Sequence, residues 1–222
     1  MKRAIICFTR VPRPGQTKTR LLPILTPMQC VGLHRAFLMD LSALYETIDA
    51  DLFVAYAPDP APDDLRQIFP KANAFFPQEG DDLGEKMLHA IHTVLAFGYD
   101  ACCLTGSDLP LLTAEHLRSG FCALEQADVT LGPTSDGGYY LVGMKRPCPE
   151  VFANQQYGGS TVWESTLAAI KNTGYTFAPA LACDDVDTPE DLRQLWKLVQ
   201  DRTTHTAAVL SRLQKEGVSL AE

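Results

Sequence analysis

Gly106-Ser107-Asp108-Leu109-Pro110-Leu111-Leu112 is the stretch that decides the fold. It follows an apolar segment, residues 99–104, that is typical of a buried strand, and it places an acidic residue where that strand ends. In open α/β sheets ligands bind outside the carboxyl ends of the strands, so Asp108 is expected at a binding edge. A carboxylate at a rigid strand end can hold a divalent cation against phosphate oxygens. The alternative is that Asp108 only caps the turn that follows, because Asp is common at turns.

Predicted strands and helices alternate along the chain on both sides of this stretch. Runs of apolar residues predict strands at 4–8, 51–57, 72–76, 128–133, 139–144 and 175–181. Capping residues, including a capping box of Thr26 and Gln29, and helical spacing predict helices from 27, at about 64–69, 83–97, 113–125 and 161–172, from 188, and at 202–215, with a proline-rich break at 58–62. This alternation predicts one α/β domain over residues 1–222 with a mostly parallel sheet. The short connection around Asp136 predicts that part of the sheet is antiparallel.

Overall composition narrows the expected partners and location. The 222 residues carry a net charge of −8 and give a pI of about 5.1. This balance argues against nonspecific binding to nucleic acid or an anionic membrane, so a bound phosphate needs a local basic cluster or a metal. No apolar run approaches the length of a membrane span, and we expect a cytoplasmic protein. The seven cysteines form no C-x-x-C pair, so we expect reduced thiols rather than disulfides or a zinc site.

One loop concentrates basic side chains in this acidic chain. Residues 9–21 follow the first predicted strand and contain Arg10, Arg13, Lys18 and Arg20. At the carboxyl end of that strand, Lys18 and Arg20 could neutralise a polyphosphate, and Gly15 would let backbone N–H groups approach it. The spacing matches neither a P-loop nor a G-x-G-x-x-G dinucleotide motif. The alternative is a solvated basic loop without a ligand.

A second acidic group follows the last predicted strand. Asp185 and Asp187 stand two residues apart, which on an extended chain places both side chains on one face. Two strand-end carboxylates from separate parts of the chain are what a shared Mg²⁺ needs, because Mg²⁺ takes one or two protein carboxylates and completes its shell with phosphates and water. The alternative is helix capping, although Thr188 already supplies a cap.

Glycine-rich turns complete the set of candidate binding elements. Residues 136–138, Asp136-Gly137-Gly138, join two predicted strands, and glycine there permits positive φ or close approach of a ligand. Gly159 and Ser160 precede a predicted helix, whose N-terminus suits an anion or a sugar hydroxyl. Gly80 and Gly84 could line a nucleotide base. Each of these segments could equally be an ordinary turn.

In this order, the segments resemble the GT-A type superfamily of nucleotidyltransferases and glycosyltransferases. More narrowly, the chain resembles the DUF2064 family of radical-SAM/selenodomain-associated transferases, and several segments are similar to the phospholactate guanylyltransferases. The matching segments cover nearly the whole chain and are residues 14–21, 80–86, 107–111, 132–141 and 185–192.

The resemblance implies a three-layer α/β/α GT-A fold with a central mixed, mostly parallel sheet. In the guanylyltransferases the Asp-Leu-Pro aspartate and the late aspartate of the Asp-x-Asp-Thr-Pro motif hold the metal, which implies Asp108 and Asp187 here. Whether Asp185 or Asp187 is the second ligand stays open. The fold does not decide the reaction, because one fold hosts many functions. A full Asp-x-Asp, common in glycosyltransferases, would need Asp where this chain has Gly106, and this favours nucleotidyl transfer.

The resulting hypothesis is a transferase that uses Mg²⁺ (or Mn²⁺) and acts on a nucleoside triphosphate or a nucleotide-sugar. Asp108 and Asp187 would hold the metal, and the catalytic residues would be Lys18, Arg20 and Asp108. The residues expected to bind the nucleotide are Arg10, Gly15, Lys18, Gly80, Gly84 and Ser107, and those expected to bind the acceptor are Asp136, Gly137, Gly138, Gly159 and Ser160. Expected partners are the nucleotide and a small-molecule acceptor, with a homodimer possible and no nucleic acid. The alternative is a nucleotide-binding module of the same fold without catalysis.

Overall fold

The centre of the molecule is a seven-stranded sheet in the order β3-β2-β1-β4-β6-β5-β7. A computed structural model describes residues 1–58 and 61–220, so the proline-rich break predicted at 58–62 lies partly outside the described residues. The strands are β1 Arg3–Thr9, β2 Asp51–Tyr56, β3 Ala74–Pro77, β4 Ala101–Thr105, β5 Val129–Pro133, β6 Tyr139–Met144 and β7 Phe177–Pro179. Each predicted strand is present, with ends shifted by a few residues.

The sheet is mixed and mostly parallel, as predicted. Strand β6 runs antiparallel to both of its neighbours, β4 and β5, and the other adjacent pairs are parallel. The β5–β6 hairpin closes through the short connection around Asp136 that predicted the antiparallel part. Because β1, β2 and β4 are parallel, their carboxyl ends lie at one edge of the sheet. The segments after Thr9, Tyr56 and Thr105 therefore start from the same edge.

Seven α-helices connect and cover these strands in the described part of the chain. They are α1 Pro27–Tyr45, α2 Asp63–Ile68, α3 Leu83–Ala96, α4 Ala114–Gln126, α5 Val162–Lys171, α6 Pro189–Val199 and α7 His205–Lys215, with short 3₁₀ turns η1 Thr19–Leu21 and η2 Pro149–Val151. The start of α1 is fixed by the predicted capping box between Thr26 and Gln29. Thr188 and Asp191 form a capping box of the same kind at the start of α6.

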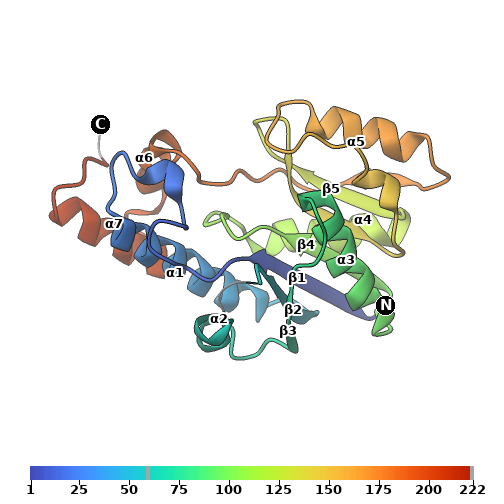
Figure 1. Cartoon of the computed structure of the whole chain (residues 1–222), viewed down its shortest axis with the longest axis horizontal. Helices are drawn as coiled ribbons and strands as arrows, with labels where there is room; N and C mark the ends of the chain where they lie inside the picture. Colours follow the sequence, from blue (N-terminus) through green and yellow to red (C-terminus); the bar gives the residue numbers. More distant parts are fainter. Residues whose placement is uncertain (59–60, 221–222) are drawn as a thin grey trace.

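Helices cover both faces of the sheet, which gives three layers (Figure 1). Alternate residues of β1 serve the two faces, because successive strand side chains point in opposite directions. Ile5 and Cys7 pack in the cluster that contains α1, α2 and α4, whereas Ala4 and Ile6 pack in the cluster that contains α3 and α5. This burial on both sides explains why the strands read as continuous apolar runs.

A third apolar cluster attaches the C-terminal helices to one end of the molecule. Leu33 and Phe37 of α1 pack there with Leu192 and Leu195 of α6 and with the buried residues of α7. Figure 1 shows α6 and α7 beside α1, far from α5. The chain reaches this cluster by crossing the sheet's carboxyl edge after β7, which carries residues 184–188 past the end of β4. None of the described helices is both long and apolar enough to cross a bilayer.

Candidate functional site

The loop after β1 carries Lys18 to the carboxyl edge of the sheet. Thr17 is buried, and its Oγ1 accepts a hydrogen bond from the backbone N–H of Arg13 at 3.0 Å, which folds the loop back on itself. Lys18 then adopts a left-handed backbone with φ 51° and ψ 42°. This conformation costs a non-glycine residue about 1–2 kcal/mol, and such residues concentrate at functional sites. The turn directs the Lys18 side chain inward, where it is only 2% exposed.

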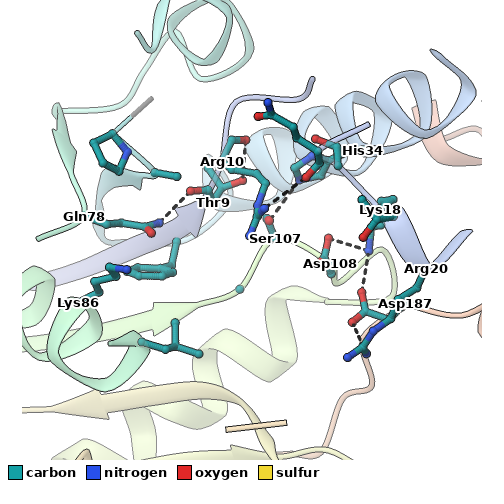
Figure 2. A pocket seen from close by; sticks show the side chains of 18 residues that line it. Thr9, Arg10, Lys18, Arg20, His34, Gln78, Lys86, Ser107, Asp108 and Asp187 are labelled. Atoms are coloured by element: carbon teal, nitrogen blue, oxygen red, sulfur yellow. Dashed lines mark hydrogen bonds and ion pairs between the residues drawn. The ribbon is translucent and has the colours of Figure 1, made fainter. Parts of the chain in front are cut away.

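The Lys18 ammonium joins three distant parts of the chain. Its Nζ lies 2.7 Å from Oδ1 of Asp108 and 3.3 Å from Oδ1 of Asp187, and it donates a short hydrogen bond to the backbone carbonyl of Val186. Arg20 Nη1 lies 3.3 Å from the other carboxylate oxygen of Asp187, Oδ2. Figure 2 shows Lys18 between the two carboxylates, with Arg20 beyond Asp187. The structure therefore brings the two strand-end acids together beside the basic loop.

Main-chain hydrogen bonds hold both carboxylates in place. The backbone N–H of Val186 donates to the carbonyl of Asp108 at 2.9 Å, which fixes the segment before α6 against the end of β4. Asp191 Oδ2 accepts the N–H groups of Asp187 and Thr188 at 3.1 and 2.7 Å. Capping of α6 is thus carried by Thr188 and Asp191. The Asp187 carboxylate instead faces Lys18 and Arg20, which argues against a capping role for it.

A cavity of about 590 Å³ opens on the basic side of these ion pairs. Its charged lining contains four cations against two carboxylates: Arg10, Lys18, Arg20 and Lys86 against Asp108 and Asp187. Ser107 lines it as well, and Figure 2 shows Gln78 and Lys86 at the end opposite Lys18. Gln78 is fixed by Nε2 bonds to the carbonyls of Thr9 and Ala55 at 2.8 and 3.1 Å. The excess of positive charge suits a polyphosphate.

A second cavity, of about 370 Å³, lies on the other side of the same carboxylates. The two cavities share a strip of lining residues: Phe8, Arg20, Leu83, Gly106, Ser107, Asp108 and Asp187. The rest of the second lining comes mainly from β6 and the 157–162 segment, and it includes Asp136, Gly138, Gly159 and Asp185. Two molecules bound one in each cavity would therefore lie next to each other, with Asp108 and Asp187 between them.

Neighbouring charges set the protonation of the acidic residues. Desolvation opposes ionisation of Asp108, but the charge and hydrogen bond of Lys18 outweigh it and hold the pKa of Asp108 below its usual value. Burial raises the pKa of Asp185 to about 6, and the charges of Asp187 and Asp136 add to that rise. Asp108 is therefore ionised at neutral pH, and negative charge accumulates around Asp185.

The structure places the other predicted site residues in different ways. Arg10 and Ser107 line the first cavity, whereas Gly15, Gly80 and Gly84 line neither of the two. A Cβ on Gly84 would stand 2.9 Å from the carbonyl oxygen of Phe152, so this glycine lets α3 pack against the 152–157 segment. Gly80 has φ +137° and lies against the first turn of α3. Their predicted part in nucleotide binding stays a prediction.

The predicted acceptor residues also divide into two groups. Asp136, Gly138 and Gly159 line the second cavity. Gly137 and Ser160 instead join two loops, because a Cβ on Gly137 would overlap the backbone carbonyl of Ser160 at 2.0 Å. The Gly137 carbonyl also accepts the backbone N–H of Trp163 at 2.8 Å. These two residues therefore shape the wall around the cavity without lining it.

Among the titratable residues of the first cavity, sequence reasoning missed His34 and Lys86. His34 is 2% exposed, and its Nε2 lies 3.3 Å from the Ser107 hydroxyl. Burial lowers the pKa of His34 to about 4, so the ring is neutral at physiological pH. Its position on the apolar face of α1 resembles a core position, and only the proximity of Ser107 reveals the link to the site. Lys86 stands within a segment that resembles the family, 80–86, and this was the signal available for it.

Comparison with known proteins identifies the family. The family described as "Uncharacterized protein conserved in bacteria (DUF2064)" matches residues 40–159. The chain is 31% identical over 207 residues to the 2-phospho-L-lactate guanylyltransferase of Methanothermobacter thermautotrophicus, covering 92% of this chain and 88% of that protein. A crystal structure of a "putative nucleotide-diphospho-sugar transferase" from Desulfovibrio desulfuricans G20 is similar with a TM-score of 0.89 at 30% identity, over 97% of this chain and 96% of that one.

More distant structures share the fold. A cytidylyltransferase from Leptospira borgpetersenii matches with a TM-score of 0.54 at 14% identity, covering 99% of this chain and 96% of that one. The sheet order, the three layers and the solved structures agree on the nucleotide-diphospho-sugar transferase fold that the sequence predicted. By its sequence, this chain belongs to the DUF2064 family.

Proposed function

We propose that the protein is a Mg²⁺-dependent nucleotidyltransferase that takes a nucleoside triphosphate and a small-molecule acceptor. The observation that carries the proposal is the meeting of Asp108, Asp187 and Lys18 between two adjoining cavities. The relative that is 31% identical is named a guanylyltransferase, which supports nucleotidyl transfer. Nucleotidyl transfer needs positioning and charge stabilisation more than covalent help, and a site built from cations suits it.

The carboxylates fit a divalent cation. Asp108 and Asp187 both approach one ammonium within 3.3 Å, so they are close enough to share a positive ion. Among the described residues no group of three or more His, Cys, Asp or Glu has a metal-holding arrangement. Two carboxylates are nevertheless a sufficient protein contribution for Mg²⁺, which completes its shell with phosphate oxygens and water. When bound there, Mg²⁺ would neutralise charge on the phosphates of the nucleotide.

The basic residues of the chain would act on the phosphates directly. Arg10 and Lys86 line the first cavity and not the second, and there they would bind and orient the β- and γ-phosphates. Arg20 belongs to the shared strip and Lys18 contacts Asp108 of that strip, so both would stabilise charge on the leaving pyrophosphate. In the transfer, the acceptor oxygen bonds to the α-phosphorus, the bond from that phosphorus to the pyrophosphate oxygen breaks, and the acceptor's proton passes to solvent.

Glycosyl transfer is the second candidate. The solved structure with a TM-score of 0.89 carries a name that refers to nucleotide-diphospho-sugars, so a nucleotide-sugar donor fits the same fold. The two reactions release different products, because nucleotidyl transfer from a triphosphate yields pyrophosphate and glycosyl transfer yields a nucleoside diphosphate. Identifying the released product distinguishes them.

The test begins with thermal unfolding of the protein with each nucleoside triphosphate and with UDP- and GDP-sugars, in Mg²⁺ or in EDTA. We expect a triphosphate to raise the Tm more in Mg²⁺ than in EDTA. We also expect pyrophosphate to be released when a mixture of small-molecule metabolites that contains the acceptor is added. Asp108→Asn should lower turnover about 10²–10³-fold and keep the fold.

The matched control is Asp49→Asn, an exposed aspartate just before β2 and thus at the opposite edge of the sheet. Equal turnover of Asp108→Asn and wild type would remove the metal role of Asp108. If a nucleotide binds but no product forms with any acceptor tested, the result would favour the alternative that the protein is a nucleotide-binding module without catalysis.

A further inference from the structure

The two cavities carry opposite charge, although they share Asp108 and Asp187. The first has Arg10, Lys18 and Lys86 as its own cations, in addition to Arg20. The second has Arg20 as its one basic side chain among the described lining residues, against four carboxylates: Asp108, Asp136, Asp185 and Asp187. An electrostatic difference of this kind favours an anion on one side and disfavours it on the other. Such a difference would direct a polyphosphate to the first cavity and leave the second for the acceptor.

Two of the four carboxylates in the second cavity have no basic partner within ion-pair distance among the described residues. Asp108 and Asp187 pair with Lys18, whereas the side-chain hydrogen bonds that the described structure gives Asp136 stay within its own turn, where its Oδ1 accepts from Gly138 N–H at 3.1 Å and from the Thr134 hydroxyl. Asp185 forms no ion pair in the described part of the chain, and it is only partly exposed. An acceptor with a phosphate or carboxylate would meet these two charges uncompensated.

Beside Thr134 and the backbone of Gly138, Gly158 and Gly159, much of the remaining wall of the second cavity is apolar and aromatic. It contains Met87 and Val162, both buried, Leu104 and Val142 from the sheet, and Tyr139 and Tyr157. The two tyrosines stack edge to face with ring centroids 6.5 Å apart, and their hydroxyl groups are 3.3 Å apart. Such a wall binds an apolar or aromatic body, and the carboxylate oxygens at its rim accept hydrogen bonds from hydroxyl groups.

We infer that the acceptor of this protein is an uncharged alcohol with an apolar or aromatic body, bound in the second cavity, and not a phosphorylated or carboxylated compound. The inference rests on the proposed function for the chemistry of the transfer. The inferred acceptor differs from that of the 31% identical guanylyltransferase, whose name gives 2-phospho-L-lactate, a compound that carries a phosphate. The cavity of about 370 Å³ limits the acceptor to a small molecule.

The test compares two probes with the same body, 2-phenylethanol and 2-phenylethyl phosphate. Both are titrated into the 222-residue protein with Mg²⁺ and inorganic pyrophosphate present, so that the first, cationic cavity is already occupied by an anion. Binding is followed by NMR at the methyl groups of Met87 and Val162, which line the second cavity and not the first. The NMR signals therefore report binding of the probe in the second cavity alone.

We expect the alcohol to bind at least about tenfold more tightly than the phosphate ester at these methyl groups. The double variant Asp136→Asn/Asp185→Asn should narrow that ratio to about threefold or less, since asparagine keeps the Oδ1 acceptor at position 136 and removes the charge. Asp201→Asn, an exposed aspartate that follows α6, is the control and should leave the ratio unchanged.

Three results would overturn the inference: tighter or equal binding of the phosphate ester, binding of neither probe at these methyl groups, or an unchanged ratio in the double variant. Nucleotide binding is measured separately by thermal unfolding. If the alcohol binds as expected but no nucleotide raises the Tm, the proposed function fails and this specificity of the cavity remains. If nucleotides raise the Tm but the phosphate ester binds more tightly than the alcohol, the inference about the acceptor fails and the proposed function remains.

Discussion

Replacing Lys18 with methionine removes a buried positive charge and keeps most of the side-chain stem. The Lys18 side chain is 2% exposed and its Nζ contacts Asp108 at 2.7 Å and Asp187 at 3.3 Å. With an effective dielectric constant of ~20, these distances correspond to gross attractions of about 6 and about 5 kcal/mol. The variant would leave both carboxylates facing each other without their shared counterion.

Most of that gross attraction is offset by desolvation of the buried ammonium. The carboxylates of Asp108 and Asp187 are 39% and 33% exposed, so water screens them once Lys18 is gone. We therefore expect a loss near the lower end of the range for breaking a buried ion pair, about 3 kcal/mol in the free energy of unfolding. For a chain of this size that corresponds to a fall of roughly 6–12 °C in Tm.

The assay is thermal and urea unfolding in EDTA, with Arg20→Met as the matched control. Arg20 also pairs with Asp187, at 3.3 Å, but its side chain is 70% exposed, so its removal should cost at most about 1 kcal/mol. Lys18→Met should therefore be clearly less stable than Arg20→Met. If the two variants unfold together, or if Lys18→Met loses less than about 0.5 kcal/mol, Lys18 does not hold the site together and the reasoning is refuted.

Three further predictions concern His34 in the first cavity, Gly84 at the start of α3 and Cys122 on α4. His34→Asn should remove one pH-dependent contribution to stability: burial lowers the pKa of His34 from 6.5 to about 4, so only the unfolded chain gains this proton between those values. The difference in stability between wild type and variant should therefore shift by about 3 kcal/mol against the wild type as pH drops from 6.5 to 4, and a difference in urea unfolding that does not change with pH would contradict this. Gly84→Ala should cost about 1–3 kcal/mol in thermal unfolding, because its Cβ would stand 2.9 Å from the Phe152 carbonyl oxygen; an unchanged Tm would mean that the 152–157 segment yields freely. Cys122, the one exposed thiol of seven, should be the only cysteine titrated by DTNB in the native protein, and reaction of more than one thiol would show that the core opens.

Much of the fold could be predicted because local signals decide it. The capping boxes at Thr26 and Thr188 lie where the sequence predicts them, since a capping box depends on residues only three positions apart. Continuous apolar runs such as β1 predict strands buried on both faces, and the two apolar clusters confirm this. Edge strand β7 is shorter than predicted, Phe177–Pro179 instead of 175–181, because its apolar run extends beyond the residues that pair with β5.

The site was predictable only as a meeting of strand ends. Asp108 and Asp187 follow from the rule that ligands bind at the carboxyl edge, together with the family resemblance. The left-handed backbone of Lys18 could not be predicted, because no glycine or asparagine stands there to indicate positive φ. For two of the predicted glycines the structure adds a packing reason that the sequence does not show. At Gly84 and Gly137 the small residue is required by close packing of backbone, a tertiary fact that the sequence does not display.

One charge at Lys18 cannot serve two sets of anions at once. In the structure its ammonium neutralises Asp108 and Asp187, and it also bonds the Val186 carbonyl. If Lys18 turns toward a phosphate in the first cavity, the two carboxylates lose their counterion and require another cation. Binding of a nucleotide and binding of a divalent cation should then strengthen each other, and by linkage the coupling is equal in both directions. The arrangement of one buried lysine between two acids thus explains why a phosphate site and a cation site would be built from the same residues.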